Sequence, residues 1–246
     1  MSRISLELVP RSEESFSEEL KLVRKQFPCV DTLNIPDILK FDVRIPEACN
    51  VAAPYFANVI PHIRAVSINK EEEFSYKEFF IEKNITEVLI VLGDNPEIVS
   101  ESENPCTSLE LIEKIKVEMP RVKVYAALDQ WRTTFEEEMD YVHQKKDAGA
   151  DGFFTQPFFD LDLMEKYAGV LEDTEVFFGL APVIRESSKE YWQEKNNVIF
   201  PEDFKCTMDW NQAFAKDVLK RTDADNTHVY LCPITIDFVE YLKGIF

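Results

Sequence analysis

Four polar residues stand where predicted strands end, and their side chains are of types that can take part in chemistry. They are Glu7, His62, Asp94 and Gln156. In parallel α/β folds, ligands bind at the C-terminal ends of the strands. A carboxyl group can transfer a proton, and a primary amide can donate and accept hydrogen bonds. We therefore expect these four side chains to converge on one ligand site.

Each of the four residues also has a purely structural explanation. Glu7 could be an ion-paired interior carboxylate, although a buried carboxylate without a task is costly. Asp94 could be a turn residue or the N-cap of a short helix. His62 could be a satisfied core histidine, and Gln156 could be a buried amide bonded to backbone. The residues alone leave both interpretations open.

The segment around Gln156 shows which elements must position these side chains. Apolar residues recur at helical spacing over residues 135–142, and Gly149 can end that helix. A strand is expected over about residues 152–156, because Pro157 cannot continue inside a sheet. Gln156 is thereby placed at the C-terminal end of a strand.

The same alternation of strand and helix recurs along the whole chain. Ile4, Leu6 and Leu8 would face an outer layer of helices, which aims Glu7 inward. Eight strands are predicted, near residues 4–9, 30–35, 60–68, 87–92, 123–127, 152–156, 175–180 and 228–232. A last amphipathic segment follows over residues 238–246. This pattern predicts a (β/α)8 TIM barrel as a single domain over residues 1–246, with a doubly wound open sheet as the alternative.

Composition argues against several classes of protein, including nucleic-acid-binding, membrane-spanning and disulfide-rich proteins. The 246 residues carry a formal net charge of -19, which argues against unaided binding of nucleic acid or anionic membranes. The five cysteines are scattered and form no Cys-x-x-Cys pair, so neither a metal site nor a disulfide framework is indicated. No apolar run approaches the length of a membrane span, and we expect a cytoplasmic protein.

Several motifs together resemble one enzyme family. Ala-Gly-Ala-Asp at residues 148–151, followed by Phe-Thr-Gln-Pro-Phe-Phe-Asp at 154–160, resembles the signature of the methylenetetrahydrofolate reductases. Five further segments are similar to elements of that family and follow in the same order. They are Ser-Leu-Glu-Leu-Val-Pro (5–10), Ile-Pro-His-Ile (60–63), Leu-Gly-Asp-Asn-Pro (92–96), Gly-Leu-Ala-Pro-Val (179–183) and Asn-Val-Ile-Phe-Pro (197–201). Each match is weak by itself, but their shared order is specific.

The resemblance implies an oxidoreductase that reduces 5,10-methylenetetrahydrofolate to 5-methyltetrahydrofolate with electrons from NAD(P)H. Glu7 would be the general acid, and Asp94 would stabilise the cationic iminium. Gln156 and Asp94 would bind the pterin, and Phe158 would be available for stacking.

The resemblance also implies that FAD carries the hydride. The residues implied to hold it are His62, Gly93, Ala127, Glu138 and Lys145. The chain departs from the family here, because Leu92 replaces an arginine and Ala-Leu-Asp-Gln-Trp at residues 127–131 replaces a Tyr-Pro-Glu-x-His stretch. With six glycines, the chain has no Gly-x-Gly-x-x-Gly motif, so a nicotinamide would not be held by a Rossmann fingerprint.

Three functional hypotheses follow from these departures. The favoured one is a reductase in which altered contacts hold FAD. The second is direct hydride transfer from NAD(P)H to folate without a flavin. The third is a folate-binding protein without reductase activity, such as a methyl-transfer partner or an accessory subunit. A homo-oligomer is compatible with each hypothesis.

Overall fold

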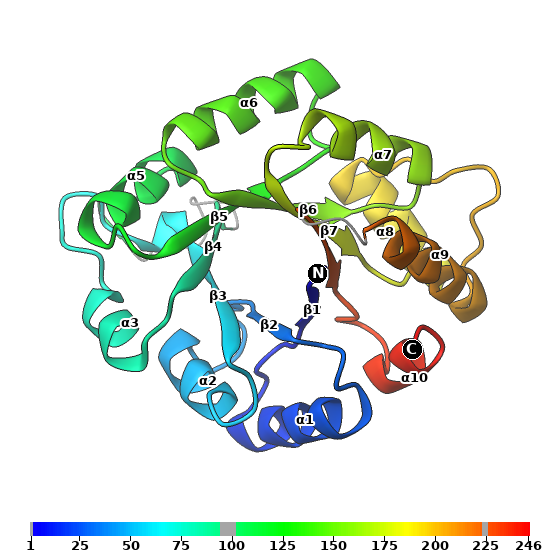
Figure 1. Cartoon of the computed structure of the whole chain (residues 1–246), viewed down its shortest axis with the longest axis horizontal. Coiled ribbons are helices and arrows are strands. Elements are labelled where there is room, and N and C mark those ends of the chain that lie inside the picture. The colour runs from blue at the N-terminus through cyan, green and yellow to red at the C-terminus, as the bar shows by residue number, and fades with distance from the viewer. Residues whose placement is uncertain (1, 94–101, 223–225) are drawn as a thin grey trace.

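The computed structural model describes residues 2–93, 102–222 and 226–246, and in them eight parallel strands close into a barrel (Figure 1). Each strand pairs with the next along the chain, and the last pairs with the first. The strands are β1 (Ile4–Glu7), β2 (Thr32–Ile35), β3 (Asn58–Arg64), β4 (Glu87–Val91), β5 (Lys123–Leu128), β6 (Gly152–Pro157), β7 (Glu175–Leu180) and β8 (Thr227–Leu231). The predicted (β/α)8 barrel is confirmed, because closure between β8 and β1 leaves no open sheet.

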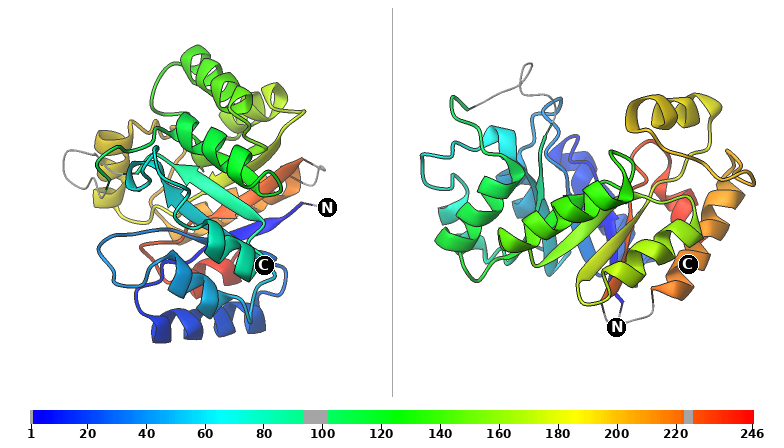
Figure 2. Two further views of the ribbon diagram at one scale, coloured as in Figure 1. Left: turned by 90° about the vertical axis from the view of Figure 1, so that its left-hand side faces the viewer. Right: turned by 90° about the horizontal axis from the view of Figure 1, so that it is seen from above.

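Helices surround the barrel on its outside (Figures 1 and 2). They are α1 (Glu13–Gln26), α2 (Ile45–Ala52), α3 (Lys77–Lys83), α5 (Ser108–Glu118), α6 (Phe135–Asp147), α7 (Leu161–Val170), α8 (Glu186–Asn196), α9 (Met208–Arg221) and α10 (Phe238–Lys243). Short polar residues start several of them. Ser12 caps α1, and Thr107 and Thr134 form capping boxes at α5 and α6. Each of these capping residues fixes the position at which its helix begins after the preceding loop.

Two of the apolar clusters lie on opposite sides of the strands. Leu6 and Phe153 belong to the large cluster between the barrel and its helices. Phe154 and Phe177 belong to a smaller cluster inside the barrel, where their rings stack with centroids 4.2 Å apart. Because neighbouring strand residues point to opposite faces, Phe153 and Phe154 serve different clusters.

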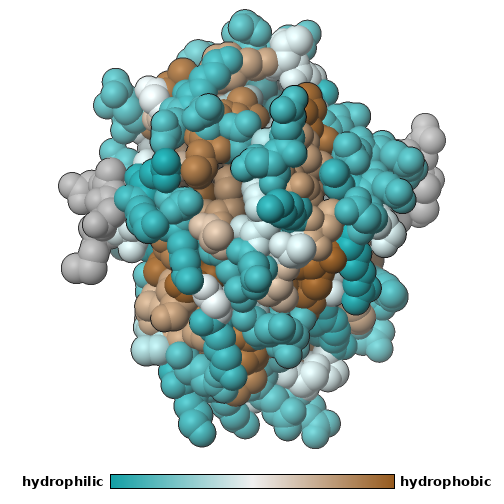
Figure 3. Space-filling model, turned by 90° about the vertical axis from the view of Figure 1, so that its right-hand side faces the viewer, coloured by the Kyte–Doolittle hydropathy of each residue, from teal (hydrophilic) through white to brown (hydrophobic). Residues whose placement is uncertain are grey.

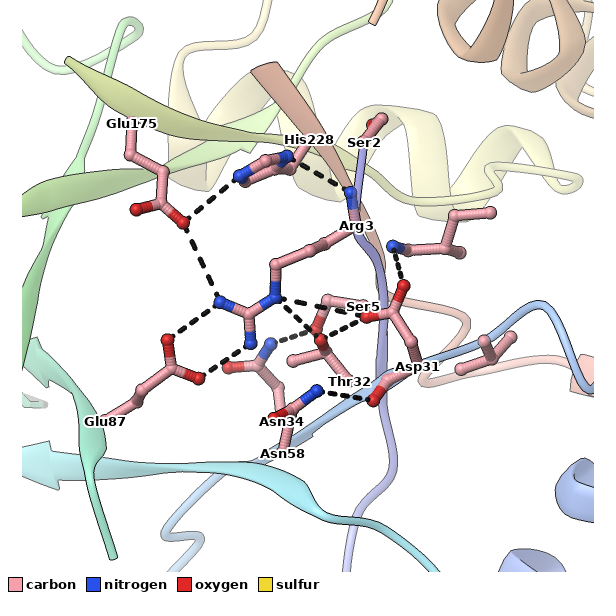
Figure 4. Close-up of polar contacts among 12 residues, drawn as sticks. Ser2, Arg3, Ser5, Asp31, Thr32, Asn34, Asn58, Glu87, Glu175 and His228 are labelled. Carbon is pink, nitrogen blue, oxygen red and sulfur yellow. Dashed lines mark hydrogen bonds and ion pairs between the residues drawn. The ribbon is translucent and has the colours of Figure 1, made fainter. Parts of the chain in front are cut away.

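The N-terminal mouth of the barrel is closed by a network of charged and polar side chains (Figure 4). Arg3 donates two hydrogen bonds to Glu87, each 2.7 Å long, and its guanidinium also lies 3.7 Å from Glu175. His228 Nε2 lies 3.1 Å from Glu175, while His228 Nδ1 accepts a hydrogen bond from the Arg3 backbone. These contacts leave the C-terminal mouth as the end at which a ligand can enter the barrel.

Most strand boundaries differ from those predicted by one or a few residues, and β1 ends at Glu7 rather than at residue 9. The strand predicted over residues 60–68 ends at Arg64, because residues Ala65–Ser67 form a 3-10 turn. β2 begins at Thr32 rather than at residue 30. β6 includes Pro157 as its last residue, where the pairing with β7 shifts register. Proline is tolerated there because its missing N–H falls at the end of the ladder.

The surface agrees with the acidic composition. Figure 3 shows hydrophilic side chains over most of one face, with hydrophobic ones in narrow strips between them. Within the described residues, no helix combines the length and the apolar character needed to cross a bilayer. The same residues contain no cluster of three or more His, Cys, Asp or Glu side chains that could hold a metal ion.

Candidate functional site

Two adjoining cavities lie at the C-terminal mouth of the barrel. The first has a volume of about 650 Å³ and the second about 500 Å³. Residues from the ends of several strands line both of them, and these shared residues are Pro36, His62, Val91, Ala127 and Gln156. Ligands in the two cavities would therefore touch the same wall.

Glu7 lies at the base of the first cavity as the last residue of β1. Its side chain is buried, and the hydroxyl of Tyr230 donates a hydrogen bond to its Oε2. Burial raises the pKa of Glu7 to about 7, and the hydrogen bond from Tyr230 opposes part of that rise. A carboxyl group with this pKa can hold a proton at neutral pH and give it to a ligand.

His62 stands beside Glu7 but does not form an ion pair with it. Its Nε2 lies 3.8 Å from Glu7 Oε2 and 3.0 Å from Asn34 Oδ1. Asn34 Nδ2 donates to Ser5 Oγ, which leaves Asn34 Oδ1 to accept the proton on Nε2. Burial lowers the pKa of His62 to about 3, so the ring is neutral. His62 therefore adds a polar wall without changing the charge of the cavity.

Gln156 lies in the wall that separates the two cavities. Its backbone oxygen accepts a hydrogen bond from Gln130 Nε2 at 2.8 Å, and the next carbonyl, of Pro157, accepts from Trp131 Nε1 at 3.0 Å. The side-chain amide of Gln156 makes none of the hydrogen bonds found among the described residues. The structural alternative, an amide satisfied by backbone, is thus not what the structure has. The amide is available to a ligand.

The first cavity has a further wall, which was not predicted from the sequence. α8 follows the C-terminal end of β7 and contributes Ser188, Tyr191 and Trp192 to the lining. Tyr191 is 59% exposed, whereas the Trp192 ring packs edge-on against Phe159. None of the residues of α8 is buried, so the helix is held over the cavity rather than packed into the core. The adjacent aromatic pair in an otherwise polar helix was the available signal.

Lys145, one of the five residues predicted to hold the cofactor, lines the second cavity. It projects from α6, and its Nζ donates a hydrogen bond of 2.6 Å to the carbonyl of Ala127. The ammonium also lies 3.9 Å from the centre of the Tyr141 ring. Burial lowers the pKa of Lys145 to about 8. Gly93, Ala127 and His62 line the same cavity, so four of the five residues predicted to hold the cofactor are together.

Two predicted site residues do not reach either cavity. The Phe158 ring is fully buried outside the barrel, against Tyr167 and Phe178. Alternation from Phe154 and Gln156 would aim it inward, but β6 ends at Pro157 and the chain turns. Glu138 is also fully buried. One of its oxygens accepts from the Asp129 backbone at 3.0 Å, and the other is 2.5 Å from Arg132.

These contacts correct both assignments. The Glu138 carboxylate holds the loop after β5 and is not free to bind the cofactor, and Phe158 packs in the core rather than against a folate. Asp94, predicted to act on the iminium and the pterin, lies outside the described residues.

Comparison with known proteins places the chain in a family. The model of the family described as methylenetetrahydrofolate reductase matches residues 42–239. The chain belongs to the methylenetetrahydrofolate reductase family. The match includes His62, Lys145 and Gln156, whereas Glu7 precedes it. The evidence that Glu7 belongs to the site is therefore its position in the lining of the first cavity. No curated protein sequence is significantly similar to the chain.

Solved structures share the fold of this methylenetetrahydrofolate reductase family member. An uncharacterized protein from Clostridium thermocellum, which binds two copies of 5-methyl-5,6,7,8-tetrahydrofolic acid, is 12% identical with a TM-score of 0.65, over 99% of this chain and 93% of that one. 2,3-Dimethylmalate lyase, a member of the PEP mutase/isocitrate lyase superfamily, is 14% identical with a TM-score of 0.58, over 95% and 76% of the two chains. Oxaloacetate acetylhydrolase is 10% identical with a TM-score of 0.58, over the same shares. At these identities, the likeness concerns the fold alone.

Proposed function

We propose that this protein reduces 5,10-methylenetetrahydrofolate to 5-methyltetrahydrofolate with electrons from NAD(P)H. The observation that carries this proposal is the pairing of two groups in one cavity. Glu7 has a pKa of about 7, and the Gln156 side-chain amide makes no hydrogen bond with the other residues that the structure describes. The volume of about 650 Å³ is within the range of small-molecule sites. Family membership directs the choice of folate as the substrate.

Glu7 would supply the proton that the reaction consumes. The methylene carbon of the substrate bridges two nitrogens, and one C–N bond must break before a hydride can add. Protonation of the leaving nitrogen by Glu7 would allow that bond to break and leave an electrophilic iminium carbon. Addition of a hydride to this carbon then gives the methyl group. One proton and one hydride are consumed, and the second nitrogen keeps the new methyl.

Gln156 and α8 would hold the two ends of the folate. The Gln156 amide has one acceptor and two donor hydrogens, which suit the amide-like edge of a pterin. Tyr191 and Trp192 provide aromatic surface for the remainder of the ligand. Tyr191 is exposed in the structure, so a stacked ring would cover apolar surface that is now in contact with water.

The second cavity fits a cofactor, with one departure. Arg64 and Lys145 supply positive charge to this cavity. His62 and Ala127 line the wall that it shares with the first cavity, and Gly93 lines the second cavity. Glu138 is engaged with Arg132 and does not contribute. We infer that these residues would hold FAD, whose chemistry when bound is the relay of a hydride from NAD(P)H. The alternative is that NAD(P)H occupies this cavity and reduces the folate directly.

A second candidate function is folate binding without reduction. The Clostridium thermocellum protein, whose fold covers nearly all of this chain, binds two copies of 5-methyltetrahydrofolate. The present chain has two adjoining cavities that share a wall, so a similar occupancy is a specific alternative. It predicts folate binding without oxidation of NAD(P)H.

One experiment separates these functions. The visible spectrum of the freshly purified protein is recorded, and then NAD(P)H and 5,10-methylenetetrahydrofolate are added in turn. A flavin band that is bleached by NAD(P)H and restored by the folate supports the FAD-dependent reductase. Turnover by a colourless protein supports direct transfer. Folate binding without turnover, even after addition of FAD, supports the non-reducing role and rejects the proposed reductase.

A further inference from the structure

The guanidinium of Arg64 is buried without a complete set of partners. Arg64 ends β3 and is 4% exposed. Its Nη1 donates a hydrogen bond of 3.2 Å to Ser67 Oγ, whereas the enclosed Nη2 has no hydrogen-bond partner in the described part of the chain. Arginine stays charged at physiological pH and carries five N–H donors. Because buried charges are normally paired, this guanidinium marks a position for an anion.

The backbone beside Arg64 makes room for its guanidinium. Arg64 pairs with Val91 across β3 and β4, which brings the side chain next to Gly93. Gly93 has φ +93°, and a Cβ at this position would lie 3.1 Å from Arg64 Nε and 2.7 Å from Val66 Cγ2. Glycine therefore meets a conformational and a spatial requirement here. Together these two strand ends fix the guanidinium in the wall of the second cavity.

Among the described residues of this wall, Arg132 and Asp37 have ion-pair partners, and Asp129 Oδ1 accepts a hydrogen bond of 3.1 Å from the Trp131 backbone. Arg132 lies 2.5 Å from Glu138, and Asp37 lies 3.4 Å from Arg44. Lys145 donates to a neutral carbonyl and, among the described residues, has no carboxylate within ion-pair distance. Burial lowers the pKa of Lys145 to about 8, and the more distant carboxylates of Glu138 and Asp129 oppose part of that shift. Among the described residues of this cavity, Arg64 and Lys145 are thus the two cations without an ion-pair partner.

We propose that Arg64, together with Lys145, binds the diphosphate of a dinucleotide in the second cavity. Arginine binds phosphate oxygens through two parallel N–H···O bonds, and lysine acts as a point charge. In a chain with a net charge of -19, such a ligand needs local cations. Leu92, before Gly93, supplies none, whereas Arg64 supplies one from the neighbouring strand. The inference rests on the proposed function in that the dinucleotide is FAD or NAD(P)H, which share the diphosphate.

Binding measurements with FAD, NADPH and NADH test this assignment. Each is titrated into the wild-type protein, Arg64→Met and Arg121→Met. Arg121 is exposed next to the N-terminal end of β5, so it matches the change in charge away from the cavity. We expect Arg64→Met to weaken the binding of at least one dinucleotide ten-fold or more, and Arg121→Met to stay within two-fold of wild type. Loss for FAD alone identifies the flavin, and loss for NADPH or NADH identifies the nicotinamide.

Two controls keep the test decisive. Arg64→Met should bind 5-methyltetrahydrofolate within two-fold of wild type, which shows that the variant is folded. In the wild-type protein, inorganic pyrophosphate should displace the dinucleotide and leave folate bound, a result that needs no variant. The assignment is overturned if no dinucleotide binds, if Arg64→Met keeps full affinity, or if pyrophosphate does not compete. Absence of folate binding would instead reject the proposed function, while the other titrations still decide the role of Arg64.

Discussion

Tyr230 donates its hydroxyl hydrogen bond to Glu7 Oε2 inside the barrel, although 223 positions separate the two residues. The contact exists because β8 closes onto β1, with Tyr230 paired to Ser5. Burial raises the pKa of Glu7 to about 7, and the hydrogen bond from Tyr230 opposes part of that rise. Closure of the barrel therefore sets the acidity of the proposed proton donor.

The first prediction concerns the pH dependence of turnover. Because Glu7 must be protonated to act as an acid, the rate should fall as pH rises through about 7. Tyr230→Phe removes the donor that favours the carboxylate, so the pKa of Glu7 and the basic limb of the profile should move up by roughly one pH unit. Tyr55→Phe, on the outer layer beside Ser17, is the control. An unchanged limb in Tyr230→Phe would contradict the role of this hydrogen bond.

The second prediction is that Glu7 destabilises the fold at high pH. Its pKa is about 7 when folded against 4.5 for the unperturbed group, so the folded state binds more protons between these values. Stability therefore falls as pH rises from 4.5 to 7, by roughly 3 kcal/mol at most. The Glu7→Gln variant has no carboxyl group at this position, so its stability should not fall with pH for this reason. Urea unfolding should show the variant more stable than wild type at pH 8, with the difference largely gone at pH 4.5. A difference independent of pH would count against the raised pKa.

The third prediction is that Gln156 contributes to folate affinity. Gln156→Leu keeps the size of the side chain and removes its hydrogen-bonding groups. We expect the Kd for 5-methyltetrahydrofolate to rise roughly 10- to 100-fold, the effect of leaving polar ligand groups unpaired. Gln144→Leu, on the exposed side of α6, is the matched control and should bind normally. Equal affinities in a calorimetric titration would remove Gln156 from the site.

The fourth prediction separates stability from ligand binding. Arg3→Met leaves Glu87 and Glu175 without their shared cation at the N-terminal mouth. The loss should cost about 3 kcal/mol, which corresponds to a fall in Tm of roughly 6–12 °C. Folate affinity should not change, because the cavities lie at the other end of the barrel. The exposed Arg121→Met variant controls for the loss of a positive charge. A folate affinity that falls with Arg3→Met would show that the two ends are coupled.

Local sequence pattern was sufficient to predict the barrel and the positions of Glu7 and Gln156 near strand ends. Strand and helix periodicities alternate clearly, and the alternation in the first strand correctly aimed Glu7 inward. The position of Gln156 before Pro157 correctly placed it at a strand end. These features depend on neighbours in the chain, and a single sequence contains them.

The remaining features depend on contacts between distant residues. The pairing of Tyr230 with Glu7 requires the closed ring. The family resemblance implies that Phe158 stacks on the ligand, but β6 ends at Pro157 with a register shift, and the Phe158 ring packs against Tyr167 and Phe178 outside the barrel. Arg132 engages Glu138 from the preceding loop, and no periodicity predicts such a contact.

The most direct test of the account is the oxidation of NADPH and NADH in the presence of 5,10-methylenetetrahydrofolate, compared between wild type and Glu7→Gln. We expect folate-dependent oxidation by the wild-type protein, with 5-methyltetrahydrofolate as product. We also predict a loss of at least roughly 100-fold in Glu7→Gln, as expected for removal of a general acid, with folate binding intact. Equal turnover by the two proteins would contradict Glu7 as the acid. Folate binding with no oxidation by the wild type, even with added FAD, would contradict the reductase itself.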